Sequence, residues 1–172
     1  MIIIYRLLIN FVFIFSPLII LIRLIKNKEH SSRFKEKFSF FSKKRSKGKL
    51  IWFHGASVGE ILSIIPLVEK LEKNKKISQI LITSNTLSSS KILSNLRLKK
   101  ITHQFFPIDT NHHTNKFLEY WKPSLAIFID SEIWPNMIIN IKKKNISLAL
   151  LNARITKKSF KRWKIFSSAS KK

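Results

Sequence analysis

Apolar residues fill the first 26 positions of the chain almost without interruption. In this stretch, MIIIYRLLINFVFIFSPLIILIRLIK, the main polar residues are Arg6, Asn10, Ser16, Arg23 and Lys26. A helix over most of its length would be about 36 Å long, enough to cross a hydrocarbon layer of about 30 Å. We therefore expect residues 1–26 to form a membrane anchor. Whether the anchor spans the bilayer or lies partly in its interface stays open, because the stretch from 7 to 22 is short.

Basic residues follow the anchor, whereas only the amino terminus precedes it. Residues 27–49 are basic and polar with interspersed phenylalanines, and we expect a basic juxtamembrane linker whose charges meet anionic headgroups. Its phenylalanines either dip into the interface or cover the following domain. The distribution of charge predicts a single N-terminal anchor with the rest of the chain in the cytoplasm.

From residue 50 onward, short apolar runs alternate with segments of helical periodicity. The pattern predicts strands at 50–54, 79–83, 102–106, 125–129 and 147–151, and helices at 60–73, 88–96, 111–121 and 135–144. Such alternation predicts an α/β fold, a Rossmann-like parallel sheet with helices on both faces, over residues 50–172. The loops after the strands then share one edge of the sheet, which is where ligands bind in folds of this kind.

The chain is strongly basic, with 33 Lys and Arg against 9 Asp and Glu and a net charge of +24. That charge favours polyanionic partners. The basic residues are scattered and form no arginine stripe with interleaved aromatics, so we expect no specific nucleic-acid partner. Cysteine is absent, which excludes disulfides and thiolate chemistry. His112 and His113 have no third ligand suitably placed, so we expect no metal site.

The first loop of the predicted edge, HGASVGE, ends in an acid at the start of a helix. Ser57 and Glu60 have the spacing of a capping box, in which each side chain satisfies the backbone of the other. The alternative interpretation makes Glu60 a general base, since a helix N-terminus stabilises an ionised carboxylate. Gly59 removes a side chain beside it and leaves room for a ligand.

Two further loops at this edge are rich in polar residues. Asp130 and Glu132 follow a buried strand in DSEIWPN, and Asn152 and Arg154 follow the last strand in LNARIT. The acids are suited to hydrogen bonds with sugar hydroxyls, or alternatively to helix capping. Arg154 is suited to binding a phosphate, or is one more surface arginine.

The motifs HGASVGE, DSEIWPN and LNARIT, in this order and spacing, resemble those of the 3-deoxy-D-manno-octulosonic acid (Kdo) transferases of lipopolysaccharide synthesis. The hydrophobic start and the RFKEKF stretch also resemble that family, and the resemblance extends to about residue 164. It implies a GT-B glycosyltransferase, with two Rossmann-like domains facing a cleft. Such an enzyme transfers Kdo from CMP-Kdo to the lipid A precursor at the membrane, without a cofactor or a metal ion.

The resemblance also implies roles for individual residues. Glu60 matches the family's general base, which deprotonates the acceptor hydroxyl, and Glu132 matches an essential acid on the acceptor side. Asp130 stands where the family usually has Glu, which leaves its role open. The remaining matches are to substrate-binding positions: Ser57, Gly59, Asn152 and Arg154.

The sequence departs from the family in length. We expect the C-terminal donor-binding domain, which supplies most of the CMP-Kdo site in the family, to be absent from this chain, which then resembles the acceptor-binding half. It is then a truncated product, a fragment, or half of a split enzyme whose donor domain is separately encoded. An inactive product or a non-catalytic module that binds anionic glycolipid at the membrane is the alternative function.

Overall fold

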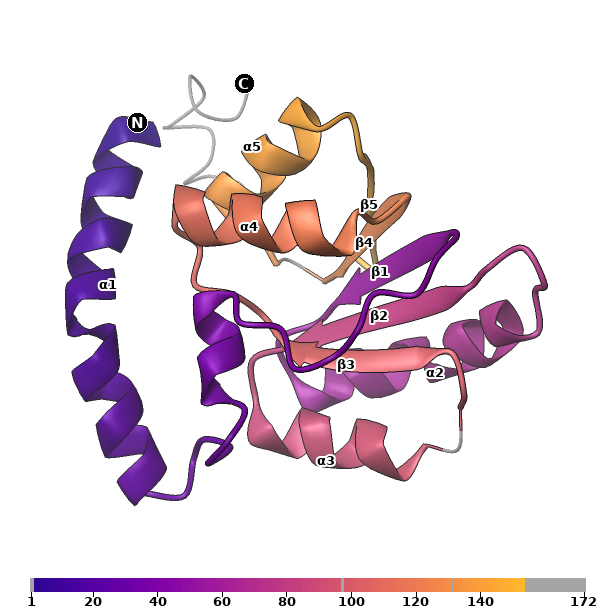
Figure 1. The fold of residues 1–172 in the computed structure, drawn as a ribbon, viewed down its shortest axis with the longest axis horizontal. Coiled ribbons are helices and arrows are strands. Elements are labelled where there is room, and N and C mark those ends of the chain that lie inside the picture. The colour runs from indigo at the N-terminus through magenta and orange to yellow at the C-terminus, as the bar shows by residue number, and fades with distance from the viewer. Residues whose placement is uncertain (1, 97, 131, 154–172) are drawn as a thin grey trace.

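The computed structural model describes residues 2–96, 98–130 and 132–153. Helices and strands alternate along the chain after an N-terminal helix (Figure 1). The elements are α1 Ile2–Ile25, the 3-10 helix η1 Phe34–Phe38, β1 Leu50–His54, α2 Val58–Glu72, β2 Gln79–Ser84, α3 Leu87–Asn95, β3 Ile101–Phe105, α4 Asn111–Trp121, β4 Leu125–Ile129, α5 Pro135–Lys143 and β5 Ser147–Leu151. The predicted α/β class is confirmed.

The five strands form one parallel sheet in the order β3-β2-β1-β4-β5. The chain builds the sheet outward from β1 through β2 to β3, then returns to the other side of β1 to add β4 and β5. The order in which the chain adds strands therefore reverses between β1 and β4, although all five strands are parallel. These two strands lie side by side, with His54 opposite Phe128. In open parallel sheets, the crevice at such a reversal is the usual place for a ligand.

Helices cover both faces of the sheet, and β1 is buried on both. On one face Trp52 packs in a cluster with Phe117 of α4 and Met137 of α5. On the other face Phe53 packs with Ile61 of α2. Successive side chains of a strand point to opposite faces, so an uninterrupted apolar strand such as LIWFH supplies both cores.

The helices begin at the carboxyl edge of the sheet, and most are capped by their own preceding residue. Side-chain oxygens accept hydrogen bonds from first-turn N–H groups in α2, α3 and α4: the caps are Ser57, Thr86 and Thr110. In α5 the N-cap residue, Trp134, makes no such bond. Asp109, from the loop after β3, accepts instead from the backbone N–H groups of Asn136 (3.0 Å) and Met137 (2.8 Å). The Asp109 carboxylate, in the loop after β3, therefore caps α5, which follows the loop after β4.

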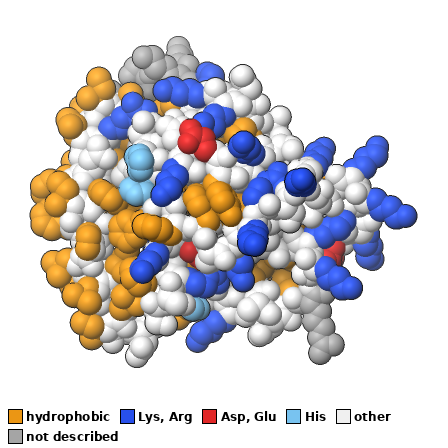
Figure 2. Space-filling model, in the orientation of Figure 1, with side chains coloured by type: hydrophobic (Ala, Val, Ile, Leu, Met, Phe, Trp, Pro, Cys, Tyr) orange, Lys and Arg blue, Asp and Glu red, His pale blue; other side chains and the backbone are white. Residues whose placement is uncertain are grey.

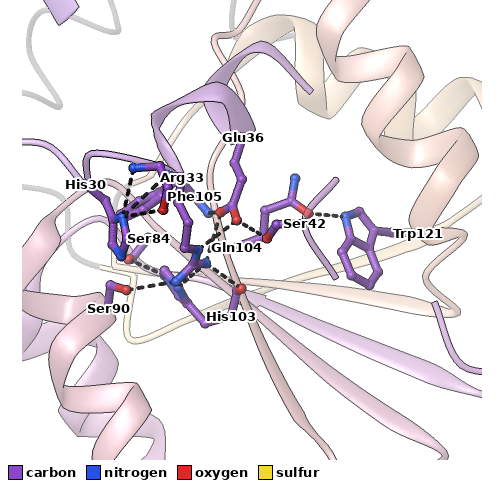
Figure 3. A network of polar contacts seen from close by, with 11 residues as sticks. His30, Arg33, Glu36, Ser42, Ser84, Ser90, His103, Gln104, Phe105 and Trp121 are labelled. Carbon is purple, nitrogen blue, oxygen red and sulfur yellow. Dashed lines mark hydrogen bonds and ion pairs between the residues drawn. The ribbon is translucent and has the colours of Figure 1, made fainter. Parts of the chain in front are cut away.

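The segment predicted to be a linker is fastened to the edge strand β3. Glu36, in η1, is only 1% exposed. Its carboxylate accepts two hydrogen bonds from the Arg33 guanidinium (2.8 and 3.0 Å), one from the backbone N–H of Phe105 (2.8 Å) and one from the Ser42 hydroxyl. Figure 3 shows this network between η1 and the sheet. Residues 33–42 thus belong to the folded domain, because a buried acid fixes them there.

Helix α1 lies beside the domain, at the left of Figure 1. It is the one helix in the described part of the chain that is long and apolar enough to cross a membrane. This finding supports the candidate membrane anchor expected from the sequence.

Candidate active site

The loops after β1 and β4 flank the reversal point of the sheet. The first loop ends at Ser57 and leads into the first turn of α2, which carries Gly59 and Glu60. The second loop carries Asp130 and Glu132. The loop after β5, which carries Asn152, is next along the same edge. The polar residues selected from the sequence therefore follow three adjacent strands, at the place where a parallel sheet binds its ligands.

Glu60 is held by hydrogen bonds from residues immediately before it. The Ser57 hydroxyl accepts from the backbone N–H of Glu60 (3.3 Å), as the predicted capping box requires. The return bond differs, because Glu60 Oε2 accepts from the N–H of Ala56 (2.8 Å) while Oε1 accepts from the Ser57 hydroxyl (2.6 Å). The carboxylate thus closes the first turn of α2 and remains partly exposed.

The two glycines of this loop have different structural roles. A Cβ on Gly55 would lie 3.1 Å from the Cβ of Glu60 and 3.0 Å from Cδ1 of Ile129, so Gly55 permits close packing of the loop beneath the helix start. A Cβ on Gly59 would meet nothing within 4 Å. The surface beside Glu60 is therefore open at Gly59, as a ligand approaching this carboxylate requires.

Glu132 is held by two aromatic side chains. The indole N–H of Trp134 donates to Glu132 Oε2 (2.8 Å), and Nε2 of His54 lies 3.5 Å from the same oxygen. His54 is fully buried and stacks on Phe106 with ring centroids 3.8 Å apart. On its other side, Nδ1 lies 3.0 Å from the Thr83 hydroxyl. The last residue of β1 thus supports the acid that follows β4.

These contacts determine whether His54 and Glu132 are charged at neutral pH. Burial lowers the pKa of His54, against the opposing influence of its hydrogen bond to Glu132, so the imidazole is neutral at pH 7. The hydrogen bond from His54 lowers the pKa of Glu132, with a further contribution from Trp134, although burial acts in the opposite direction. Glu132 is accordingly an ionised carboxylate that accepts hydrogen bonds at neutral pH.

Asp130 and Asn152 connect the loops after β4 and β5. The side-chain amide of Asn152 donates to Asp130 Oδ1 (2.6 Å). Both residues have left-handed backbone conformations, with φ of 57° and 56°, which Asp and Asn tolerate better than most residues. Arg154, the phosphate ligand expected from the sequence, lies outside the described residues, as does Ser131.

Two features of this edge were not selected from the sequence as site residues. His54 and Trp134 bracket Glu132, and Asp109 caps α5. A signal for His54 was present, since it is a polar residue at the end of a buried strand, but its contact with Glu132 depends on the pairing of β1 with β4. Within the described ranges, no three His, Asp or Glu side chains are grouped so that they could hold a metal ion.

Comparison with known proteins identifies a family model and several similar proteins. A family model described as 3-deoxy-D-manno-octulosonic-acid transferase (kdotransferase) matches residues 32–172. A 3-deoxy-D-manno-octulosonic acid transferase of Rickettsia bellii is 46% identical over 146 residues, which cover 85% of this chain and 35% of that protein. A probable mitochondrial 3-deoxy-D-manno-octulosonic acid transferase of Arabidopsis thaliana is 41% identical over 151 residues, or 86% of this chain and 34% of that protein. The chain spans about a third of the length of these curated relatives.

Proposed function

The chain belongs to the Kdo transferase family, and we propose that it is the acceptor-binding half of an enzyme that transfers Kdo from CMP-Kdo to a lipid A precursor. The observation that carries the proposal is the position of Glu60 and Glu132. Glu60 lies in the first turn of α2, which follows β1, and Glu132 lies in the loop after β4, so the two acids flank the reversal point of the sheet. The proposal for the donor follows the family's two-domain architecture, in which a C-terminal domain binds CMP-Kdo.

In the proposed reaction, Glu60 acts as the general base. It takes the proton of an acceptor hydroxyl as that oxygen forms a bond to the anomeric carbon of Kdo. The bond between this carbon and the phosphate oxygen of CMP breaks, and CMP leaves with the electron pair. Hydrogen bonds from Ala56 and Ser57 fix the carboxylate, and the open surface at Gly59 leaves space for the acceptor.

Glu132 is proposed to bind the acceptor sugar. Its Oε2 is held by Trp134 and His54, whereas Oε1 accepts no hydrogen bond from the described residues. An ionised carboxylate with one oxygen held and one available is suited to accept a hydrogen bond from a sugar hydroxyl. Asp130 and Asn152 extend this polar surface, and Arg154 is proposed to bind a phosphate of the acceptor. No metal ion or cofactor has a part in this mechanism.

The proposed location is the cytoplasmic face of the inner membrane, with α1 as the anchor. The net charge of +24 favours approach to anionic lipid and to a phosphorylated acceptor. A second domain, whether on the same polypeptide or separately encoded, would bring the donor to this edge. Holding both substrates in attack geometry requires both halves of the cleft.

The test of the base assignment is Glu60→Gln in a full-length transferase that contains this chain. Glutamine retains a hydrogen-bond acceptor at the helix start but does not take up the proton. We expect kcat to fall about 10²- to 10⁴-fold, the contribution of a positioned general base, with little change in KM. Glu69→Gln is the matched control, because Glu69 is an exposed acid on the same helix. Near-normal transfer by Glu60→Gln would exclude Glu60 as the base.

A binding measurement distinguishes the transferase from a non-catalytic glycolipid-binding module. The 172-residue chain is mixed with a lipid A precursor in detergent, and binding is compared with that of Glu132→Gln. Weaker binding by Glu132→Gln would support a lipid A precursor site at Glu132, which both the transferase and the binding-module hypotheses require. Turnover by the full-length protein then favours the enzyme, and binding without any turnover favours the module.

A further inference from the structure

Helix α1 is joined to the domain by side-chain hydrogen bonds near its N-terminus. The Tyr5 hydroxyl donates to Asp109 Oδ2 (2.7 Å), and Nε of Arg6 donates to the side-chain oxygen of Asn136 (2.9 Å). Asp109 follows β3, and Asn136 lies in the first turn of α5. Both attachment points therefore belong to the carboxyl edge of the sheet.

The middle and the end of α1 also contact folded parts of the chain. The Phe13 ring lies 4.9 Å from the ring of His113, in the first turn of α4, and 6.0 Å from that of Phe38 in η1 (centroid distances). Arg23 forms an ion pair with Glu29 (2.6 Å). From Tyr5 to Arg23 the helix rises about 27 Å, so the contacts run along nearly its whole length.

The opposite side of α1 carries a continuous stripe of exposed apolar side chains. Seven side chains at helical spacing are 53–73% exposed: Ile3, Leu7, Phe11, Ile14, Leu18, Leu21 and Ile25. Figure 2 shows hydrophobic side chains gathered over the side of the molecule where α1 lies, and Lys and Arg over much of the rest of the same face. Exposed apolar surface of this extent marks an interaction site.

The chemistry of the helix points to lipid as the occupant of this stripe. The polar side chains Tyr5, Arg6 and Ser16 lie on the domain side of α1, whereas the stripe itself is wholly apolar. Exposed Lys26 and Lys28 follow the helix directly. An apolar face bordered by cations fits a leaflet with anionic headgroups.

The contacts with the domain are incompatible with a helix that crosses the bilayer. If α1 stood across the hydrocarbon layer, the domain surface along those 27 Å or so of helix would lie at the same depth. That surface includes Glu29, Lys37 and Asp109, and charged groups are expensive at the bilayer centre. We propose that α1 instead lies in the plane of one leaflet, with its apolar stripe in the lipid.

In this orientation, the carboxyl edge of the sheet is held at the level of the headgroups. The helix contacts the loop after β3 and the first turns of α4 and α5. The first turn of α2, with Glu60, and the loop with Glu132 belong to the same edge. A substrate anchored in that leaflet meets the edge without leaving the membrane. The orientation rests on the contacts of α1 and does not depend on the proposed transferase reaction.

Spin-label depth measurements test this orientation directly. The sequence has no cysteine, so each stripe position can carry a single cysteine with a nitroxide label. The 172-residue chain is bound to vesicles of phosphatidylethanolamine and phosphatidylglycerol, and collisions with oxygen and with a water-soluble nickel complex report depth. An in-plane helix gives similar depths of about 5–10 Å at all seven sites. Depth that peaks near Phe11 and Ile14 and falls toward both ends would show a spanning helix and overturn the proposal.

Vesicle flotation provides a second test that needs no label. Leu7→Glu combined with Ile14→Glu places two charges in the stripe, and we expect at least a tenfold loss of vesicle-bound chain. Leu62→Glu is the matched control, since Leu62 is a 50% exposed leucine on α2, away from the stripe. Circular dichroism verifies that each variant is folded. Unchanged flotation of the folded double variant would show that the stripe is not the lipid-binding surface.

Discussion

Two pairs of carboxylates in this chain have opposite surroundings. Glu36 and Asp109 are each 1% exposed and accept hydrogen bonds from residues up to 104 positions away. Glu60 and Glu132 are partly exposed, and the hydrogen bonds of Glu60 come from residues no more than four positions away. The first pair joins distant parts of the fold, whereas the second is oriented at the edge of the sheet. Burial thus separates these structural acids from the candidate functional ones.

The largest loss of stability is expected for Glu36→Ala. Removing this carboxylate leaves the Arg33 guanidinium and the Phe105 N–H without their buried partner, at a cost of about 3–5 kcal/mol in free energy of unfolding. Denaturant titration followed by tryptophan fluorescence measures the change. Glu69→Ala, an exposed acid, should stay within about 0.5 kcal/mol. An equally small effect at position 36 would contradict the structural role of Glu36.

Asp109→Ala is expected to cost somewhat less, about 2–3 kcal/mol. The substitution removes the cap of α5 and the acceptor of the Tyr5 hydroxyl. The same titration measures it, with Glu119→Ala as control, because the Glu119 side chain is 65% exposed. A loss no greater than that of the control would show that α5 does not need this cap.

Acidification should also weaken the buried network, through His103. Burial, with smaller effects from Arg33 and His30, lowers the pKa of His103 to about 3. The unfolded chain takes up this proton near pH 6.5, whereas the folded chain does not until about pH 3, so stability falls as the pH falls through this interval. From pH 7.5 to 5.0 we expect a loss of about 2 kcal/mol from this residue.

The measurement compares unfolding free energies at the two pH values for the unsubstituted chain and for His103→Gln. The variant should lose about 2 kcal/mol less on acidification. Part of the pH dependence remains in the variant, because burial also lowers the pKa of His54. Equal pH dependence of both proteins would rule out His103 as the source.

The smallest effects on stability are expected for Glu60→Gln and Glu132→Gln. Both side chains are partly exposed, and glutamine keeps an acceptor oxygen, so we expect each change to cost less than about 1 kcal/mol. Unfolding titrations of the two variants measure this cost beside that of Glu36→Ala. A cost at either site as large as that at Glu36 would remove the distinction between the two pairs of acids.

Much of the fold could be predicted from local patterns. The predicted bounds of β1, β4, β5 and α4 coincide with those observed, because a short apolar strand or an amphipathic helix shows its pattern within a few residues. The α/β alternation then placed the polar loops on one edge of the sheet. The observed capping by Ser57 likewise follows from neighbouring residues.

Contacts between distant positions could not be predicted in this way. The bond from Phe105 to Glu36 joins residues 69 positions apart, and nothing local distinguishes Glu36 from a solvated charge in a basic linker. The support of Glu132 by His54 requires β1 and β4 to be neighbours. Local patterns therefore predicted which loops share the edge, but the partners that fix each side chain arise from the three-dimensional fold.

The attachment of α1 also has a consequence for the order of events during synthesis. Tyr5 leaves the ribosome 104 residues before its partner Asp109, which at about 5–20 residues per second is an interval of roughly 5–20 s. Throughout that interval the domain surface that receives the helix does not yet exist. The apolar surface of the nascent helix is therefore exposed before its partner surface has been made, and lipid or a chaperone would have to cover it until the domain folds.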